Sequence, residues 1–190
     1  MPNNIFIFLR HAETKVDRNI KISHWKLTNK GKIDALAISK LNLFNDVDII
    51  MSSNEDKAYQ TVYPLSVKLN KEIIRDENLN EILRDDGSFI ENKEEYVKIM
   101  KLCVENRTQS FNDWETCNHA LERFSKRIDE IDFKYSNKKI LISSHGGVIN
   151  FYFAKILGEL DKLFERMLTT TFCDYGIVQN GKVLKDIAKI

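Results

Sequence analysis

The sequence predicts an α/β fold, a three-layer α/β/α sandwich in which helices cover both faces of a mostly parallel central sheet. Three short apolar runs rich in β-branched residues are typical of buried strands: Ile5–Leu9, Val47–Met51 and Ile140–Ser143. Segments with helical periodicity lie between these runs, and a chain that alternates strands with helices favours parallel strand order. The 190 residues contain no repeat and no linker rich in Pro, Gly or Ser, so residues 1–190 are expected to form a single domain.

Four segments are expected to be helices. Thr28 is a candidate N-cap for the first, because its side-chain oxygen can accept a hydrogen bond from the first turn. The second contains Pro64, which is expected to kink it. The fourth, residues 148–157, is apolar almost all round, as is typical of a well-buried helix. The apolar residues that recur at helical spacing in the first three segments are Ile33, Leu36, Ala37 and Leu41, then Ala58, Val62, Leu65 and Leu69, then Leu121, Phe124, Ile128 and Ile131.

The C-terminal end of the sequence predicts an antiparallel β-hairpin. Residues 175–178 and 183–187 flank the dipeptide Asn180–Gly181, which is typical of a two-residue hairpin turn. Before this hairpin, the segment from about residue 78 to 113 is the least regular and the most charged part of the chain. Such an excursion in an α/β fold often lies over the strand ends, so we expect it to form a small cap there.

The overall charge of the chain gives no general attraction to polyanions. Lys and Arg number 29 and Asp and Glu 28, a net charge of +1, so neither nucleic acid nor an anionic membrane is an expected partner. Three cysteines without a CxxC pair argue against a disulfide framework or a structural zinc site and favour a reduced setting. The first apolar run is interrupted at Arg10, and no segment approaches the ~20 apolar residues of a membrane span, so we expect a soluble, cytoplasmic protein.

Basic and imidazole side chains follow two of the predicted strands. Arg10 and His11 end the first strand, and His145 follows the strand near residue 140 and precedes Gly146 and Gly147. Ligands of parallel sheets bind at the carboxyl ends of the strands, so both histidines are expected in one crevice if the strands are neighbours. The two glycines open a helix there, and their N–H groups would face an anion.

A third strand end adds another cation. The second apolar run ends at Ser52–Ser53, and Lys57 lies one turn into the helix behind it. Arg10, Lys57 and two histidines around one crevice would form a compact anion site, and phosphate is the anion we expect. Each residue alone also has a structural interpretation, as a salt-bridge partner, a surface charge or a hydrogen-bonding histidine. Their common place at strand ends favours the functional one.

Four segments of the chain resemble, in order, the motifs of the histidine phosphatase superfamily, in its phosphoglycerate mutase-like branch. The segments are LRHAET, SSNEDKAYQT, NLNEILRDDGSF and ISSHGGVI. That family reads LRHGET, SxxxRAxxTA, LxExxxGxxEG and a strand that ends in SHG. The segment LTNKG at residues 27–31 fits the family's LTxxG as well, and the likeness extends from residue 4 to about 158.

The resemblance implies a role for each of these residues. His11 would be the nucleophile that becomes phosphohistidine, and Glu81 the general acid that protonates the leaving group. Arg10, Lys57 and His145 would bind the phosphoryl oxygens. Gly146 is expected to join them through its backbone N–H, because of its place at the start of a helix. The chemistry agrees, because an imidazole attacks phosphorus only when it is neutral, and neighbouring cations keep its pKa low. No cluster of metal ligands is visible, so neither a metal nor a cofactor is expected.

Three residues depart from the family pattern. Ala12 stands where the family mostly has Gly, which is a mild change if φ is negative there. Lys57 replaces an arginine, so a point charge replaces a bidentate fork. Asp17 stands where many members have Asn near the phosphate. Its carboxylate would repel the substrate unless it turns away or pairs with Lys15 or Arg18.

The function expected from these observations is that of a metal-independent phosphatase, a hydrolase that acts on a small phosphorylated metabolite. The cofactor-dependent mutases of the family are longer than these 190 residues. A phosphoglycerate mutase remains an alternative, and so does a phosphate-ester binding module with weak or no catalysis, because of Lys57 and Asp17. Aromatic residues of the cap would form its core or contact the substrate; they are Phe89, Tyr96, Phe111 and Trp114. The sequence predicts neither the identity of the substrate nor the oligomeric state.

Overall fold

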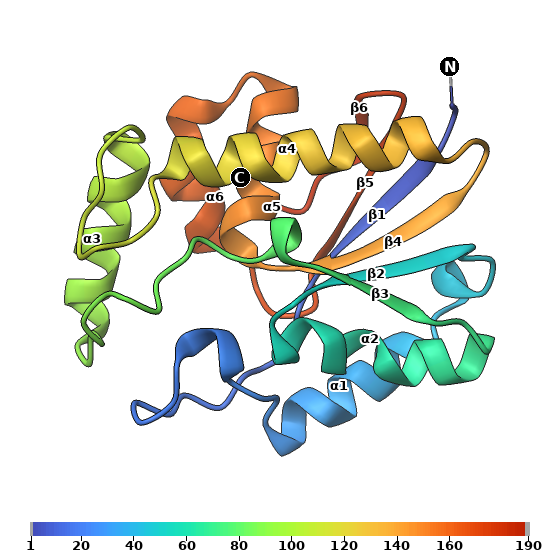
Figure 1. Cartoon of the computed structure of the whole chain (residues 1–190), viewed down its shortest axis with the longest axis horizontal. Coiled ribbons are helices and arrows are strands. Elements are labelled where there is room, and N and C mark those ends of the chain that lie inside the picture. Colours follow the sequence, from blue (N-terminus) through green and yellow to red (C-terminus); the bar gives the residue numbers. More distant parts are fainter. Residues whose placement is uncertain (1, 189–190) are drawn as a thin grey trace.

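The computed structural model describes residues 2–188 and contains a six-stranded sheet between two layers of helices (Figure 1). The strand order is β3-β2-β4-β1-β5-β6. Strands β1 to β4 run parallel, and β5 and β6 complete the sheet as an antiparallel hairpin. The strand bounds are β1 Ile5–Arg10, β2 Ile49–Ser53, β3 Ile73–Asp76, β4 Lys139–Ser144, β5 Tyr175–Gln179 and β6 Lys182–Lys185. The predicted α/β fold is therefore confirmed.

Helices cover both faces of the sheet. Helices α1 and α2 lie on one face and α4, α5 and α6 on the other, while α3 lies beyond the strand ends (Figure 1). The bounds are α1 Asn29–Ser39, α2 Asp56–Leu69, α3 Lys93–Glu105, α4 Cys117–Lys134, α5 Gly146–Leu157 and α6 Leu163–Thr169. Within residues 2–188, no helix combines the length and the apolar character that crossing a bilayer requires.

Strand β1 separates two hydrophobic cores. Phe8 contacts Phe124 of α4 on one face of the sheet. Ile7 and Leu9 point to the other face and pack with Val62 of α2. The strand is also hydrogen-bonded on both sides, to β4 and to β5. Because β1 is paired on both edges and packed on both faces, the backbone position of the residues at its carboxyl end is well defined.

Helix α1 begins where the sequence predicts. Thr28 Oγ1 accepts a hydrogen bond from the N–H of Gly31 at 2.9 Å, as expected of an N-cap. A Cβ atom on Gly31 would lie 2.2 Å from the backbone oxygen of Glu13, so a side chain does not fit here. The start of α1 therefore packs directly on the loop that follows β1.

The buried face of α1 differs from the predicted apolar stripe. The stripe residues Ile33, Leu36, Ala37 and Leu41 are all exposed. The buried residues are instead Gly31, Ala35, Ile38 and Ser39, whose spacing of three and four residues places them on one side of the helix. The predicted face was wrong because α1 packs through Ala35 and Ile38, and Ile38 shares a core cluster with Val62 of α2, while the residues of the predicted stripe point to solvent.

Other boundaries agree with the sequence in part. Ser52 and Ser53 are the last residues of β2, and α2 runs through Pro64 as one continuous helix. The hairpin turn has positive φ at Asn180 and Gly181, 51° and 70°, as a type I′ turn requires. Its second strand ends at Lys185, two residues earlier than predicted. Strand β3 and helices α3 and α6 are elements that the sequence did not predict.

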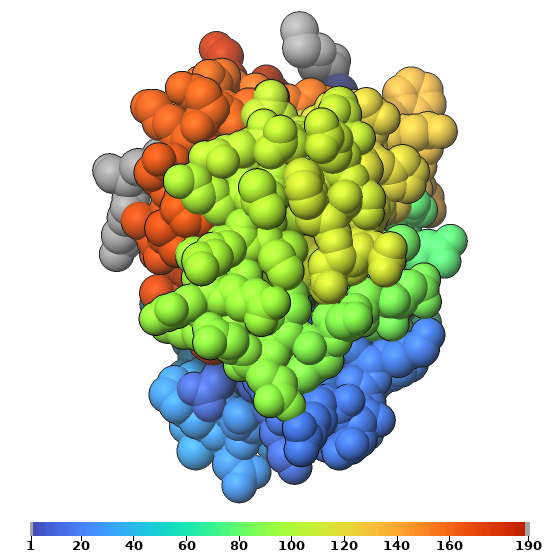
Figure 2. All heavy atoms as spheres, turned by 90° about the vertical axis from the view of Figure 1, so that its left-hand side faces the viewer, coloured from blue at the N-terminus to red at the C-terminus, as the bar shows by residue number. Residues whose placement is uncertain are grey.

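The charged excursion between β3 and α4 covers the end of the molecule where the parallel strands stop. It consists of a 3₁₀ turn at Glu77–Leu79, a loop, helix α3 and a second loop. Figure 2 shows this excursion in yellow-green across the face, with N-terminal segments in blue below it. The excursion is called the cap from here on, and its position is the one that the sequence predicts.

Candidate active site

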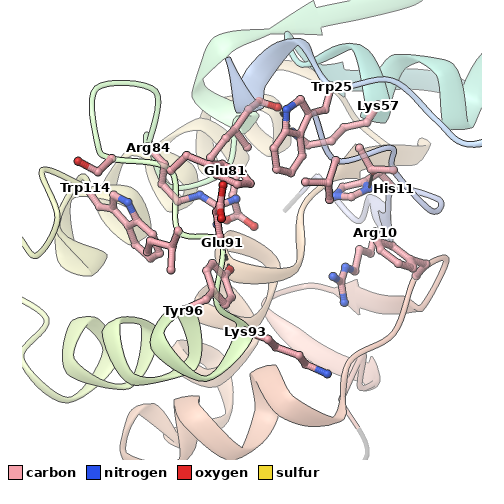
Figure 3. A pocket seen from close by; sticks show the side chains of 17 residues that line it. Arg10, His11, Trp25, Lys57, Glu81, Arg84, Glu91, Lys93, Tyr96 and Trp114 are labelled. Carbon is pink, nitrogen blue, oxygen red and sulfur yellow. Dashed lines mark hydrogen bonds between the residues drawn. The ribbon is translucent and has the colours of Figure 1, made fainter. Parts of the chain in front are cut away.

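A pocket of about 540 Å³ lies between the strand ends and the cap (Figure 3). Arg10 and His11 reach it from β1, and Lys57 reaches it from α2. Glu81 and Arg84 belong to the cap loop and add further charged groups to its wall. Four residues that the sequence singled out are thus brought together, although up to 71 positions separate them (81 − 10).

The imidazole of His11 is oriented by its own backbone. Its Nδ1 lies 2.8 Å from the carbonyl oxygen of Ala12 and 3.1 Å from Thr14 Oγ1. A carbonyl oxygen only accepts hydrogen bonds, so Nδ1 carries the proton and Nε2 keeps its lone pair. Burial, helped by His145 and Lys57, holds the pKa of His11 well below its usual range. A neutral imidazole with a free Nε2 therefore lines the pocket.

His145 lies directly behind His11. The two ring centroids are 5.2 Å apart, and His145 is fully buried, so it does not itself line the pocket. Its Nε2 is 2.7 Å from Ser53 Oγ and 3.3 Å from Glu55 Oε1, whereas its Nδ1 has no hydrogen-bond partner among residues 2–188. Burial and the charge of Lys57 hold the pKa of His145 well below its usual range.

The carboxylate of Glu81 occupies the N-terminus of α5. Its Oε2 accepts from the N–H of Gly147 at 3.0 Å, and its Oε1 from the N–H of Val148 at 3.2 Å. Of these two donors, Gly147 is one that the sequence offered to a bound anion, and the structure gives it to Glu81. Gly146 instead lies against Arg10, where a Cβ atom would be 3.1 Å from Arg10 Nε. Phosphate binding by Gly146 stays a prediction.

The resting form of Glu81 is the carboxylate. Burial by itself would raise the pKa of Glu81, but His145, Arg84 and the N–H of Gly147 outweigh burial and lower it. A group that acts as an acid must first receive a proton. Glu81 therefore has to gain a proton before it can protonate a leaving group.

Lys57 is paired inside the site by a residue that the sequence did not single out. Its ammonium group forms a buried ion pair with Glu55 and donates to the carbonyl oxygen of Ile22 at 2.8 Å. Glu55 Oε1 also accepts from the N–H of Glu81 at 2.8 Å and faces His145. Glu55 therefore touches three candidate residues at once. The signal in the sequence was an acidic residue two positions before the lysine in SSNEDK.

Arg10 is the second cation beside His11. Its Nη1 donates to the carbonyl oxygen of Thr170 at 2.7 Å, and its guanidinium lies 4.9 Å from the ring centroid of Phe172. Its Nε has no partner among the described residues. Burial lowers the pKa of Arg10, although nearby groups led by Glu81 oppose this. Phe172 is a pocket residue that the sequence did not single out.

The two remaining departures from the family pattern bring neither a left-handed backbone nor a carboxylate into the pocket wall. Ala12 is fully buried, is absent from the residues with positive φ, and donates its N–H to Thr61 Oγ1 at 2.9 Å. Asp17 does not line the pocket, and its carboxylate accepts from the N–H of Asn19 at 3.0 Å. The carboxylate of Asp17 therefore bonds within its own loop, and Arg18 pairs with Glu91 and not with Asp17.

The mouth of the pocket is bridged by contacts between the loop after β1 and the cap. Arg18 forms an exposed ion pair with Glu91. The rings of Trp25 and Phe89 meet edge to face, with centroids 6.2 Å apart. Of the cap aromatics, Phe89, Tyr96 and Trp114 line the pocket, whereas Phe111 packs on the core.

Within residues 2–188, no three or more His, Cys, Asp and Glu side chains are grouped so that they could hold a metal ion. The cations of this site are instead supplied by arginine and lysine side chains.

Replacing Glu55 with glutamine is expected to destabilise the protein by about 3 kcal/mol, because Lys57 would lose its buried counter-charge. Phosphate should then restore part of the stability, since its negative charge would replace the missing carboxylate. The measurement is the Tm with and without phosphate. Asp56→Asn, which removes a partly exposed partner of Arg75, is the matched control. An equal phosphate-induced Tm shift in wild type and Glu55→Gln would contradict the expectation.

Comparisons with known proteins show the family and the fold of the chain. The family model described as "Histidine phosphatase superfamily (branch 1)" matches residues 6–187. No curated protein matches the chain. Three solved structures illustrate its similarity to proteins of known structure. The native mycobacterial glucosyl-3-phosphoglycerate phosphatase is 14% identical, with a TM-score of 0.77, and the match covers 97% of this chain and 99% of that one.

The other two structures are somewhat closer in sequence. A phosphoserine phosphatase mutant from Entamoeba histolytica, in complex with phosphoserine, is 19% identical with a TM-score of 0.76, over 96% and 94% of the two chains. YhfR from Bacillus stearothermophilus is 21% identical with a TM-score of 0.78, over 98% of each chain. At such low sequence identities these matches show that the fold is shared. The substrates in the names of these proteins are theirs and are not transferred to this chain.

Proposed function

The chain belongs to the histidine phosphatase superfamily, and from this premise we propose that it is a metal-independent phosphatase of a small phosphorylated metabolite, with His11 as its nucleophile. The observation that carries the proposal is the neutral imidazole of His11, whose Nδ1–H is bound to the Ala12 carbonyl. This leaves Nε2 as the only free lone pair of the ring, beside Arg10 and Lys57.

The proposed reaction has two steps. In the first, the Nε2 lone pair of His11 attacks phosphorus, the N–P bond forms, and the P–O bond to the leaving group breaks. The leaving oxygen takes a proton from Glu81. In the second, water attacks the phosphohistidine and the N–P pair returns to Nε2. Glu81 receives the proton of the water and passes it to the departing phosphate, which restores the carboxylate. Arg10 and Lys57 offset the charge on the phosphoryl oxygens in both steps, and His145 is proposed to join them.

The substrate can supply the proton that Glu81 lacks at rest. The second ionisation of a phosphomonoester has a pKa of about 6, so a fraction of the substrate arrives as the monoanion at neutral pH. The negative phosphoryl group also raises the pKa of a nearby carboxyl. Glu81 is therefore proposed to take up the substrate's own proton in the complex and to pass it to the leaving oxygen.

The test is phosphate release from p-nitrophenyl phosphate and a panel of phosphorylated metabolites, with EDTA present throughout. The panel includes phosphoserine and 3-phosphoglyceric acid, which occur in complexes of the Entamoeba relative. We expect release in EDTA at the same rate as without it. A clear loss of activity in EDTA would contradict a metal-independent reaction.

Two other outcomes would indicate the alternatives. Interconversion of 2- and 3-phosphoglycerate with little free phosphate would indicate a mutase. Binding of phosphate esters without turnover would indicate a binding module. A cytoplasmic location is part of the proposal and is supported by the three free thiols of Cys103, Cys117 and Cys173.

A further inference from the structure

We propose that Arg84 forms a second anion subsite in the pocket, and that the substrate is a phosphomonoester whose leaving group carries a carboxylate or a second phosphate. The inference rests on the proposed function, because it takes the phosphoryl group to lie against His11. The leaving group then extends from His11 toward the cap. Arg84 is the guanidinium that the cap presents to the same pocket (Figure 3).

Arg84 is held in place by aromatic side chains. Its guanidinium lies 5.3 Å from the ring centroid of Trp114 and 5.9 Å from that of Tyr96. Its Nη1 donates to Tyr96 Oη at 3.0 Å. Stacking on an aromatic face keeps the plane of a guanidinium fixed without neutralising its charge. Arg84 therefore offers a positioned cation.

The charge of Arg84 has no carboxylate partner at ion-pair distance. Five arginines in the described part of the chain form salt bridges: Arg18, Arg75, Arg123, Arg127 and Arg166. Arg10, Arg84 and Arg107 do not, and of these Arg10 and Arg84 line the pocket. Burial lowers the pKa of Arg84, but Tyr96, Glu81 and Glu55 outweigh burial and raise it. The side chain is charged, and an anionic ligand would complete its environment.

The free edge of the guanidinium matches a planar anion. Tyr96 engages Nη1, while Nε is buried without a partner and Nη2 makes no hydrogen bond to any residue of the range 2–188. Nε and Nη2 lie on the same edge of the side chain, which is the edge that binds a carboxylate or phosphate through two parallel hydrogen bonds. A neutral hydroxyl would satisfy that edge only in part.

The rest of the wall limits the leaving group. Lys93, at the start of α3, is a second cation that the cap adds to the pocket, and Glu91 is already engaged by Arg18. Trp25 and Phe89 make the outer wall apolar. A volume of about 540 Å³ suits a compact organic acid or sugar phosphate better than a protein side chain on a folded surface.

The experiment compares substrates that differ in one group. Phosphoserine and phosphoethanolamine differ in a carboxylate, and fructose 1,6-bisphosphate and fructose 6-phosphate differ in a second phosphate. For each pair, kcat/KM is measured with wild type, Arg84→Met and Arg84→Lys. We expect wild type to prefer the more anionic member of at least one pair. The pair that shows the preference identifies the group bound by Arg84 as a carboxylate or a phosphate. In Arg84→Met that preference should fall by roughly 10- to 100-fold, as for the loss of a charged hydrogen-bonded pair. Arg84→Lys should retain part of it.

Matched variants keep a structural role of Arg84 distinguishable. Arg107→Met removes a cap arginine outside this pocket and should leave the preference unchanged. Tyr96→Phe removes the hydroxyl that holds Nη1 and should weaken the preference while the charge remains. No wild-type preference in either pair, or an equal loss for both members of a pair in Arg84→Met, would overturn the subsite. Absence of phosphate release by wild type from every substrate, p-nitrophenyl phosphate included, would instead overturn the proposed function.

Discussion

Replacing His11 with alanine is expected to lower kcat/KM for every substrate by at least ~10³-fold, because the variant loses the only nucleophile proposed for the reaction. The imidazole lies in the pocket wall, so its removal enlarges the pocket and leaves no enclosed cavity. The Tm should stay near that of wild type. Phosphate binding should also persist, since Arg10 and Lys57 remain in place.

The covalent intermediate gives this variant a direct readout. Wild type quenched during turnover of a ³²P-labelled substrate should carry a label that is stable in base and lost in acid, as a phosphoramidate is. His11→Ala should carry none. His119→Ala is the matched control, because His119 is exposed on α4 and pairs with Glu115 away from the pocket. If His11→Ala still formed the acid-labile adduct, the nucleophile would have to be another residue.

Replacing Glu81 with glutamine is expected to lower kcat by ~10²- to 10⁴-fold for alkyl phosphates, the range that general acid catalysis supplies. The loss should be much smaller for p-nitrophenyl phosphate, because p-nitrophenolate leaves without needing a proton. A structural role of Glu81 would lower both rates equally. The comparison of the two leaving groups therefore separates proton transfer from damage to the N-terminus of α5, where Glu81 binds Gly147 and Val148.

The pH dependence of wild type follows from the same groups. The pKa of His11 lies well below 6.5, so the imidazole stays neutral as the pH falls through that value. The pKa of Glu81 is lowered as well, so the reacting proton comes with the substrate monoanion. With alkyl phosphates, kcat/KM should thus fall as the pH rises above about 6, where the substrate loses its second proton. A rate that instead rises through pH 6.5 would mean that His11 titrates with an ordinary pKa.

The sequence was informative where chemistry depends on strand ends. Arg10, His11 and Lys57 could be placed in one crevice because parallel strands bring their carboxyl ends to the same edge, whatever the details of packing. The same argument brought His145 next to His11. It did not reveal that Glu81 covers the N-terminus of α5, since that contact depends on how the cap loop folds back.

Other features of the fold and of the site depend on tertiary contacts, which the periodicity of apolar residues in the sequence does not predict. The exposed stripe of α1 has good helical spacing, yet the helix packs through another side, where Ile38 shares a core cluster with residues of α2. Strand β3 has only four residues and two exposed positions among them, so its apolar signal is weak. Glu55 and Arg84 are single charges in polar stretches, and only their neighbours in space distinguish them from surface residues.

The position of β1 between two cores also bears on how such a protein changes over generations. The proposed nucleophile follows a strand that is paired on both sides and buried on both faces. Arg84 belongs to neither core, although its neighbour Trp114 is part of the core around Phe8. Substitutions at cap positions that line the pocket outside the cores, such as Arg84, can therefore accumulate without disturbing the strand that holds His11. A lineage built on this architecture is free to diversify its choice of substrate while inheriting one unaltered reaction.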